Sequence, residues 1–264
     1  MKKKYYPSTI IQALVLMLIS LILVSPLIIF EKNQYLSPEV ITTGIFILLF
    51  FLMIGISYLV NKKRKVIIGN EFKINNTELI PLMALIVIIF QIGFVKSLNH
   101  IVKVLFDKEV ILSNPLDPLI FTLGAMLIGP IIEEIFFRGT ILKGFLSNYT
   151  PKMAIIVSAL IFGVIHIRPE QVWGAILLGL FFGWIYYKTR SIGITIILHI
   201  IANFSIIFQS YLFNKYSNIA TVTTISIYIT PISVILICIA LKRLYNKMNL
   251  SNLNYNETNM IFKK

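Results

Sequence analysis

Six polar residues and one aromatic neighbour lie inside long apolar runs of the sequence and are the candidates for chemistry. They include two of the protein's three histidines and its only pair of adjacent acidic residues. An ionisable group at the centre of a bilayer costs roughly 2.5 to 3.5 kcal/mol on insertion scales, so each such group needs a partner or a function. The set comprises Glu133, Glu134, Arg138, Phe162, His166, His199 and Asn203.

Helical spacing sorts these residues into faces. Glu134 and Arg138 are four residues apart, so they share one face of a helix and can form an ion pair. Glu133 is rotated by about 100° from Glu134 and is expected to point elsewhere. His199 and Asn203 are also four residues apart, so both can address one point in a helical bundle.

Two local features flank these residues. Phe162 is one helical turn before His166, so the two rings are expected to stack on the same face. Pro130 lacks an amide hydrogen and leaves a carbonyl one turn earlier without its usual donor. The helix is therefore expected to open or bend just before the two acids.

Two hydrolytic mechanisms are open to a carboxylate, two imidazoles and an amide that converge in a low-dielectric bundle. In the first, Glu133, His166 and His199 bind Zn²⁺, which lowers the pKa of a bound water to about 7. In the second, Glu133 itself is the general base for a water that His166 helps to hold. His199 and Asn203 then donate hydrogen bonds to the developing oxyanion.

Each feature also has a structural interpretation. A single histidine in a membrane span is more often a packing residue, and an i,i+4 pair such as Glu134–Arg138 is usually structural. Asn203 alone would be read as a donor of an interhelical hydrogen bond. The occurrence of all three patterns on successive apolar segments favours a functional site over three separate structural roles.

The composition sets the class of protein in which this chemistry must take place. The chain has 264 residues, of which 57% are hydrophobic and 13% are charged, and its mean hydropathy is +0.86. An average soluble domain is roughly a quarter charged, so a soluble globular protein and a disordered chain are both excluded. The single cysteine, Cys238, excludes an intrachain disulfide.

Eight apolar runs predict an all-α fold, a polytopic transmembrane bundle of about eight helices. A helix needs about 20 apolar residues to cross a bilayer, and most of the runs are long enough. The fifth and sixth runs are short and could form a tilted or partly buried pair. The runs are Ile10–Phe30, Val40–Val60, Leu79–Val95, Leu119–Leu146, Met153–Ile167, Val172–Tyr187, Ile192–Leu212 and Ile219–Leu241.

The formal net charge of +13 is explained by topology. With eight spans and a cytoplasmic N-terminus, 18 of the 24 Lys and Arg fall on the inner side. The positive-inside rule therefore predicts a multi-pass protein of the cell membrane with both termini in the cytoplasm. The basic residues are spread over several segments without a nucleic-acid-binding module, so no nucleic-acid partner is expected.

Three motifs, taken in order, resemble a known family of membrane proteases. Glu133-Glu134-xxx-Arg138, Phe162-xxx-His166 and His199-xxx-Asn203 are similar to the three motifs of the CPBP family. This family comprises the type II CAAX prenyl proteases and the Abi proteins, which process bacteriocins. The resemblance covers about residues 118 to 210, and the flanks support it: Pro130, Gly139, the glycines Gly174, Gly179 and Gly183, and the run from Tyr186 to Arg190.

The resemblance implies hydrolysis of a peptide bond within or near the membrane. By carry-over, Glu133 activates water with the help of His166, and His199 and Asn203 complete the site. Glu134 and Arg138 support it, with Phe162 beside His166. The family is described both as a set of metalloproteases and as glutamate-dependent, so Zn²⁺ held by Glu133, His166 and His199 stays one of two alternatives. A His-Glu-x-x-His motif does not occur in the chain.

The resemblance also organises the chain. Residues 118–212 are predicted to form a protease core of four helices. Residues 1–117 form an N-terminal membrane region with three transmembrane helices, and residues 213–264 form the last transmembrane helix and a polar cytoplasmic tail.

The expected partners are the lipid bilayer and a membrane-tethered protein or peptide substrate. Short loops and a composition rich in lysine and asparagine resemble a bacterial member, with roles such as bacteriocin immunity or pheromone processing. No feature specifies an oligomeric state. Two other functions remain open: a non-enzymatic immunity or scaffold protein of the same fold, and an ion-coupled transporter, since intramembrane Glu and His also mark ion paths.

Overall fold

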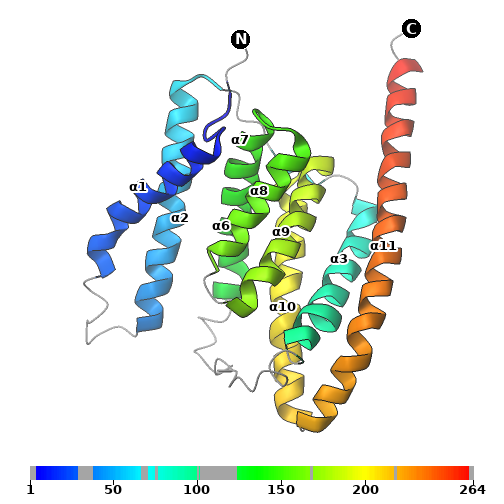
Figure 1. The fold of residues 1–264 in the computed structure, drawn as a ribbon. Coiled ribbons are helices and arrows are strands. Elements are labelled where there is room, and N and C mark those ends of the chain that lie inside the picture. Colours follow the sequence, from blue (N-terminus) through cyan, green and yellow to red (C-terminus); the bar gives the residue numbers. More distant parts are fainter. Residues whose placement is uncertain are drawn as a thin grey trace. The chain divides into compact units, whose positions relative to one another are not determined.

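The computed structural model is built from helices, and no strand occurs among the residues that it describes (Figure 1). The predicted all-α polytopic bundle is therefore confirmed. The described residues are 4–28, 38–66, 71–74, 77–99, 101, 124–166, 169–216 and 219–261.

The chain divides into two compact units, which are described separately. The first unit comprises Met1–Asn75 and Asp117–Ile197, and the second comprises Asn76–Leu116 and Leu198–Lys264. Glu133, Arg138 and His166 thus belong to the first unit, whereas His199 and Asn203 belong to the second. The predicted domain boundaries at 117 and 212 stay a prediction.

The first unit is built from helices of very different lengths. The helix with the two acids runs without interruption from Gly124 to Leu146 and has four parts: η4, α6, η5 and α7. The elements of this unit are α1 (Ile10–Ile28), α2 (Pro38–Lys63), η4 (Gly124–Ile128), α6 (Gly129–Phe136), η5 (Phe137–Leu142), α7 (Lys143–Leu146), α8 (Pro151–Val164), α9 (Pro169–Thr189) and the start of α10 (Ile192–Tyr216).

The helix with the acids changes its hydrogen-bond pattern twice. Its first part, η4, is π-helical and ends directly before the turn that contains Pro130. Proline cannot donate to the preceding turn, and a wider π-helical turn is one way to accommodate the loss. The expected opening before the acids is confirmed. A second π-helical segment, η5, contains Arg138.

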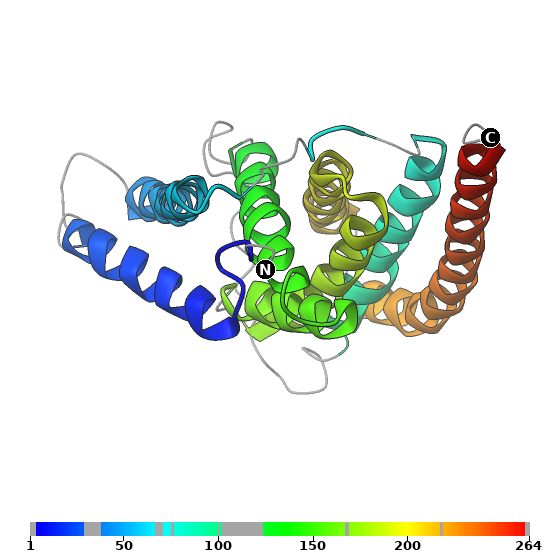
Figure 2. The same cartoon turned by 90° about the horizontal axis from the view of Figure 1, so that it is seen from above.

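Helices α8 and α9 form a tight antiparallel pair, and they lie side by side in both views (Figure 1 and Figure 2). Thr150 caps α8, because its hydroxyl accepts a hydrogen bond from the amide of Met153, and Pro151 follows in the first turn. Glycines allow the close approach. A Cβ at Gly179 would lie 3.1 Å from the Cα of Ala159, and a Cβ at Gly163 would lie 2.9 Å from the carbonyl oxygen of Val172.

Aromatic rings from three helices fill the core of the first unit. Phe50 of α2 packs edge-on against Phe136, with ring centroids 5.2 Å apart. Phe136 and Phe137 are 5.0 Å apart, and Phe137 reaches Phe162 of α8 at 4.9 Å. All four side chains are buried. Because edge-to-face pairs of this kind are favourable and directional, they fix the rotation of the acid-bearing helix between α2 and α8.

The second unit pairs a broken helix with a long one. Helix α3 (Ile80–Ile88) follows η2 (Thr77–Leu79) and continues into π-helical η3 (Ile89–Lys96), and α11 (Ile219–Ile261) packs along both. A Cβ at Gly93 would lie 2.6 Å from the Cβ of Ser233. Small residues at this crossing therefore let the two backbones approach, as is common between membrane helices.

Five helices are long and apolar enough to cross a membrane, judged by length and composition in the part of the chain that the structure describes. They are Ile10–Leu27, Thr43–Lys63, Thr77–Asn99, Gln171–Thr189 and Thr224–Asn249. They correspond to the first, second, third, sixth and eighth predicted runs. The sixth run was expected to be short, but its helix has 19 residues in this range.

The remaining predicted runs differ from ordinary spans. The fifth was expected to be short, and α8 has 14 residues, or about 21 Å at 1.5 Å per residue, against a hydrocarbon core of about 30 Å. The apolar part of α10, Ile192–Phe208, is also shorter. The fourth run contains four charged residues between Gly124 and Leu146. Its start, residues 119–123, lies outside the described residues.

Candidate active site

Arg138 is a fully buried cation with a carboxylate partner on its own helix. Its Nη1 lies 2.9 Å from Oε1 of Glu134, and the two side chains are 2% and 0% exposed. The i,i+4 pairing predicted from the sequence is confirmed. Removing one partner of such a buried pair typically costs about 3 to 5 kcal/mol, because the other charge stays buried without compensation.

The guanidinium group of Arg138 also reaches two neighbouring helices. Its Nη2 donates to the carbonyl oxygen of Gly179 in α9, at 3.4 Å. Its Cζ lies 4.8 Å from the ring centroid of Phe162 in α8 and 5.5 Å from that of Phe182 in α9. Arginine can serve all these partners together because its planar group carries several donors at its edge and stacks on aromatic faces.

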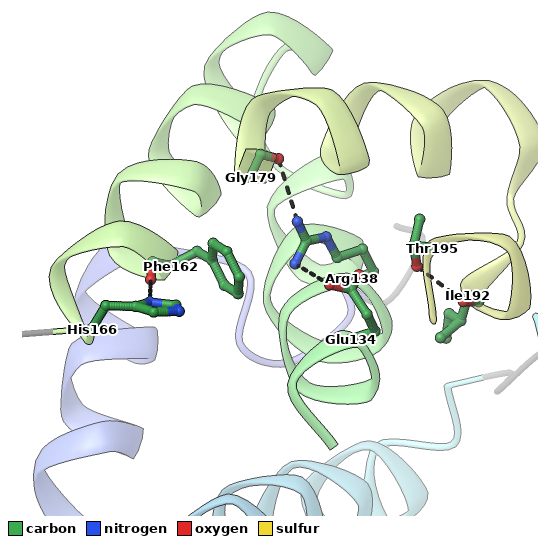
Figure 3. A network of polar contacts seen from close by, with 7 residues as sticks. All are labelled: Glu134, Arg138, Phe162, His166, Gly179, Ile192 and Thr195. Atoms are coloured by element: carbon green, nitrogen blue, oxygen red, sulfur yellow. Dashed lines mark hydrogen bonds and ion pairs between the residues drawn. The ribbon is translucent and has the colours of Figure 1, made fainter. Parts of the chain in front are cut away.

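The ring of Phe162 lies between Arg138 and His166 (Figure 3). On the side away from the guanidinium, the phenyl ring meets the imidazole edge-on, with centroids 4.9 Å apart. The contact expected from the spacing of Phe162 and His166 is confirmed. The side chain of Phe162 is therefore the physical link between the first two motifs, which are on different helices.

His166 lies in the turn that follows α8, and its backbone amide donates to the carbonyl oxygen of Gly163. Its Nδ1 is 2.8 Å from the carbonyl oxygen of Phe162. A carbonyl oxygen can only accept, so Nδ1 carries the proton of this hydrogen bond. In the neutral ring, Nε2 then has the lone pair and is the atom that can bind a water proton or a metal.

Glu133 is in α6, one residue before the buried Glu134, and its side chain is half-buried. One of its carboxylate oxygens, Oε2, has no accessible surface. The other, Oε1, lies 3.8 Å from the point that a Cβ of Gly129 would occupy, which is ordinary van der Waals contact. Glu133 is thus a second acid at the level of the Glu134–Arg138 pair, on a neighbouring face of the helix.

His199 and Asn203 are one turn apart in α10; His199 is buried and Asn203 is half-buried. Ser191 defines the start of this helix, because its hydroxyl accepts a hydrogen bond from the amide of Ile194 at 3.2 Å. Since these two motif residues belong to the second compact unit, the convergence of all four predicted catalytic residues stays a prediction.

The zinc ligands predicted from the sequence are Glu133, His166 and His199. Among the described residues, no group of three or more His, Cys, Asp and Glu side chains is close enough to hold a metal ion. The orientation of His166 is nevertheless one that metal-binding histidines adopt, with the second ring nitrogen fixed by a carbonyl oxygen. Zn²⁺ bound by Glu133, His166 and His199 stays a prediction.

Three contributors were not predicted from the sequence. Gly179 and Phe182 contact Arg138 from α9, and the only sequence signal was the series of glycines in that run. Glu71 lies outside the apolar runs, and no motif or spacing marks it. It is the only acid between the basic block at 62–65 and Lys73, and its carboxylate pairs with Lys143 at 2.8 Å.

Comparisons with known proteins agree with the motifs. Residues 115–205 match the family model described as type II CAAX prenyl endopeptidase Rce1-like. The chain is 31% identical over 84 residues to the Bacillus subtilis (strain 168) protein named "Putative membrane peptidase YdiL". That alignment covers 31% of this chain and 34% of the relative, so the chain matches about a third of the relative's length. No solved structure matches the chain.

All three motifs lie within the matched segment, and the helices around it identify the protein as a multi-pass membrane protein. The resemblance predicted from Glu133, His166, His199 and their neighbours is confirmed: residues 115–205 match the family model of the type II CAAX prenyl endopeptidases, described as Rce1-like.

Proposed function

We propose that the protein is an intramembrane endopeptidase that hydrolyses a peptide bond of a membrane-associated protein or peptide. The observation that carries the proposal is the stack of Arg138, Phe162 and His166, which joins two of the three family motifs across two helices. An ion pair with only a structural role would not need an aromatic ring between it and a histidine. A catalytic site does need contacts of this kind, because its imidazole must be held in a fixed orientation near a carboxylate.

Glu133 is the general base in this proposal. It removes a proton from a water molecule as the water attacks the carbonyl carbon of the scissile bond. The same proton then passes from the carboxylic acid of Glu133 to the leaving amine, so that the base is restored at the end of the cycle. His166 accepts a hydrogen bond from the attacking water at Nε2, the nitrogen that its contact with Phe162 leaves without a proton.

His199 and Asn203 donate to the oxyanion that forms on the carbonyl oxygen. An imidazole N–H and an amide N–H are both suitable donors. Because the protein holds them in place before the reaction, no free energy is spent on orienting them as the oxyanion forms. Glu134 and Arg138 support the site through Phe162 and do not take part in proton transfer.

A metal is an alternative within the same proposal. A carboxylate and two imidazoles are a donor set that zinc accepts, and the bound ion would lower the pKa of a water ligand. Glu133, His166 and His199 would hold it, with His166 binding through Nε2. The steps above depend only on groups of the protein chain.

The substrate is proposed to be a membrane-tethered protein or peptide. The name of the Bacillus relative includes the words membrane peptidase, and the matching family model describes prenyl endopeptidases. Bacteriocin immunity and pheromone processing are the roles that the family resemblance adds for a bacterial membrane protein. The whole activity remains a proposal, because the alignment spans only about a third of the relative.

We further propose that both termini lie in the cytoplasm. The N-terminal segment contacts two other segments that the basic residues assign to the inner side. The amide of Tyr6 donates to Oδ1 of Asn61 at 2.8 Å, and the ammonium group of Lys4 donates to Asn148. These contacts support one common side for residues 4–9, 61–66 and 147–152, and the excess of Lys and Arg supports the cytoplasmic one.

The decisive experiment is cleavage by purified protein in liposomes. The substrates are two membrane-anchored fluorogenic peptides, one with a prenylated C-terminus and one with a transmembrane anchor. Glu133→Gln keeps the shape of the side chain but removes the base, so kcat should fall by about a hundredfold or more. Glu78→Gln, an exposed glutamate of η2, is the matched control and should retain full activity. Full activity of Glu133→Gln and His166→Ala would refute the proposal.

A further inference from the structure

One carboxylate outside the three motifs contacts three of the elements that position them. Glu71 lies in the short segment 71–74 after α2. Its side chain forms an ion pair with Lys143 of α7 at 2.8 Å and accepts a hydrogen bond from the hydroxyl of Tyr186 in α9. Its backbone carbonyl oxygen accepts from the amide of Ile192, the first residue of α10, at 2.7 Å. All four residues belong to the first compact unit.

Each of the three residues that contact Glu71 lies on a helix that carries or contacts residues of the candidate site. Lys143 follows Arg138 by five residues in the same continuous helix. Tyr186 follows Phe182, which contacts Arg138, by one turn of α9. Ile192 begins the helix in which His199 follows two turns later. Glu71 thus contacts the helix that carries the first motif, the neighbouring helix α9 and the start of the helix with the third motif.

The side chain of Glu71 is partly buried against these helices, whereas Phe72 and Ile74 of the same segment are exposed. The side chains of Glu71 and Lys143 are only 18% and 16% exposed, and Tyr186 is fully buried. A Cβ at Gly193 would lie 2.7 Å from the carbonyl oxygen of Phe72, so the glycine lets the segment approach the start of α10. Charge-assisted hydrogen bonds in such a partly dehydrated place are stronger than their exposed equivalents.

The N-terminal segment covers the same cluster. The ammonium group of Lys143 lies 4.9 Å from the ring centroid of Tyr5. Burial, and secondarily the charge of Glu71, raise the pKa of Tyr5 to about 12. Gly144, next to Lys143, leaves no room for a side chain against the carbonyl group of Pro7. The contacts of Glu71 are therefore shielded from water by protein on more than one side.

We propose that Glu71 is a positioning residue of the peptidase: it fixes the start of α10, the helix in which His199 and Asn203 follow, to the helix that carries Glu133. The catalytic part of this inference rests on the proposed function, whereas the anchoring of α10 does not. Glu71 touches no reacting group in this scheme and acts only through Lys143, Tyr186 and Ile192.

The anchoring is tested first, by hydrogen–deuterium exchange of the purified full-length protein. The reporter is the peptide with the first amides of α10, residues 190–198. Glu71→Ala should raise the exchange of these amides by about tenfold, because a local opening becomes easier when a charge-assisted contact is lost. Tyr186→Phe removes a single hydroxyl and should give a smaller increase. Glu78→Gln should exchange like the wild type. Unchanged exchange in both Glu71→Ala and Tyr186→Phe would overturn the inference.

The catalytic consequence is tested by steady-state kinetics on the same samples. Glu71→Ala should lower kcat by about tenfold with KM within about twofold, since a misplaced oxyanion donor affects the transition state more than the bound substrate. Glu71→Gln keeps an acceptor for Tyr186 and should recover part of the loss. An unchanged kcat per folded molecule would show a merely structural role and overturn the positioning inference.

A coupling measurement keeps the test valid if Glu71→Ala folds poorly. Glu71→Gln and Lys143→Gln both remove the ion pair between Glu71 and Lys143, so their combined effect on kcat should be smaller than the sum of the two single effects. Strict additivity would argue against a shared role. If the wild type cleaves neither peptide, the proposed function fails, and the exchange experiment still decides whether Glu71 anchors α10.

Discussion

At the scale of single residues, Arg138 meets three kinds of partner: a carboxylate, a backbone carbonyl and the faces of two aromatic rings. Only a planar cation with several donors satisfies all of them, so the residue is not interchangeable with lysine. The charge of Arg138 is matched by Glu134, and its shape determines where Phe162 lies. The position of His166 therefore depends on a residue that it does not contact directly.

Arg138→Lys should accordingly keep the positive charge but lose the contact between the guanidinium group and the ring of Phe162. We expect at least a tenfold loss of kcat with a moderate fall in melting temperature, because the ammonium group of lysine cannot pair with Glu134 and cover Phe162 together. Arg64→Lys is the control, since Arg64 lies 5.2 Å over the ring of Tyr6, away from the motifs. Wild-type kinetics of Arg138→Lys would show that charge alone is sufficient.

The protonation of His166 is a second expectation at this scale. Because Nδ1 donates to the carbonyl oxygen of Phe162, the neutral ring should be the Nδ1–H tautomer. Nitrogen-15 NMR of histidine-labelled protein in detergent distinguishes the two tautomers. The His166→Ala spectrum identifies the signals to compare. An Nε2–H tautomer in the wild type would contradict the assigned role of Nε2.

At the scale of elements, the pair α8–α9 depends on how closely its backbones approach. Gly163→Ala adds a Cβ that would lie 2.9 Å from the carbonyl oxygen of Val172, and backbone must move to admit it. We expect a loss of about 1 to 3 kcal/mol in stability, typical of overpacking, and reduced activity because His166 follows in the next turn. Thermal unfolding in detergent measures the first effect, and the peptide assay the second.

The matched variant is Gly55→Ala in α2, where a Cβ meets nothing within 4 Å. Alanine has the higher helix propensity, so this change should be neutral or slightly stabilising. Equal destabilisation by both substitutions would mean that the close approach of α8 and α9 contributes little.

The same scale shows what the sequence can and cannot predict. Hydropathy identified the apolar helices, and i,i+4 spacing predicted the contacts Glu134–Arg138 and Phe162–His166, because both lie within one chain segment. The contacts of Arg138 with Gly179 and Phe182 depend on how α9 packs, which no local pattern encodes. The π-helical turns are also set by packing, although Pro130 marked the site of the first one.

At the scale of the whole molecule, the distribution of charge predicts a testable topology. Cys238 is exposed and is the only cysteine, so a Cys238→Ser background allows single cysteines to be introduced. Lys63→Cys and Lys152→Cys should react with a membrane-impermeant maleimide only after lysis, because the positive-inside rule places both in the cytoplasm. Lys32→Cys and Lys215→Cys, on the predicted outer side, should react in intact cells. The reverse pattern would invert the orientation of the protein.

The length of α8 has a consequence for the reach of a substrate. From its cap at Thr150 to its end at Val164 the helix rises about 21 Å, and His166 follows in the next turn. An extended peptide advances about 3.3 Å per residue. A strand that enters beside Thr150 therefore needs six or seven residues, on the order of 20 Å, to bring a peptide bond to the level of His166. For a substrate that enters on this side, tails shorter than this length should not be cleaved, whatever their sequence.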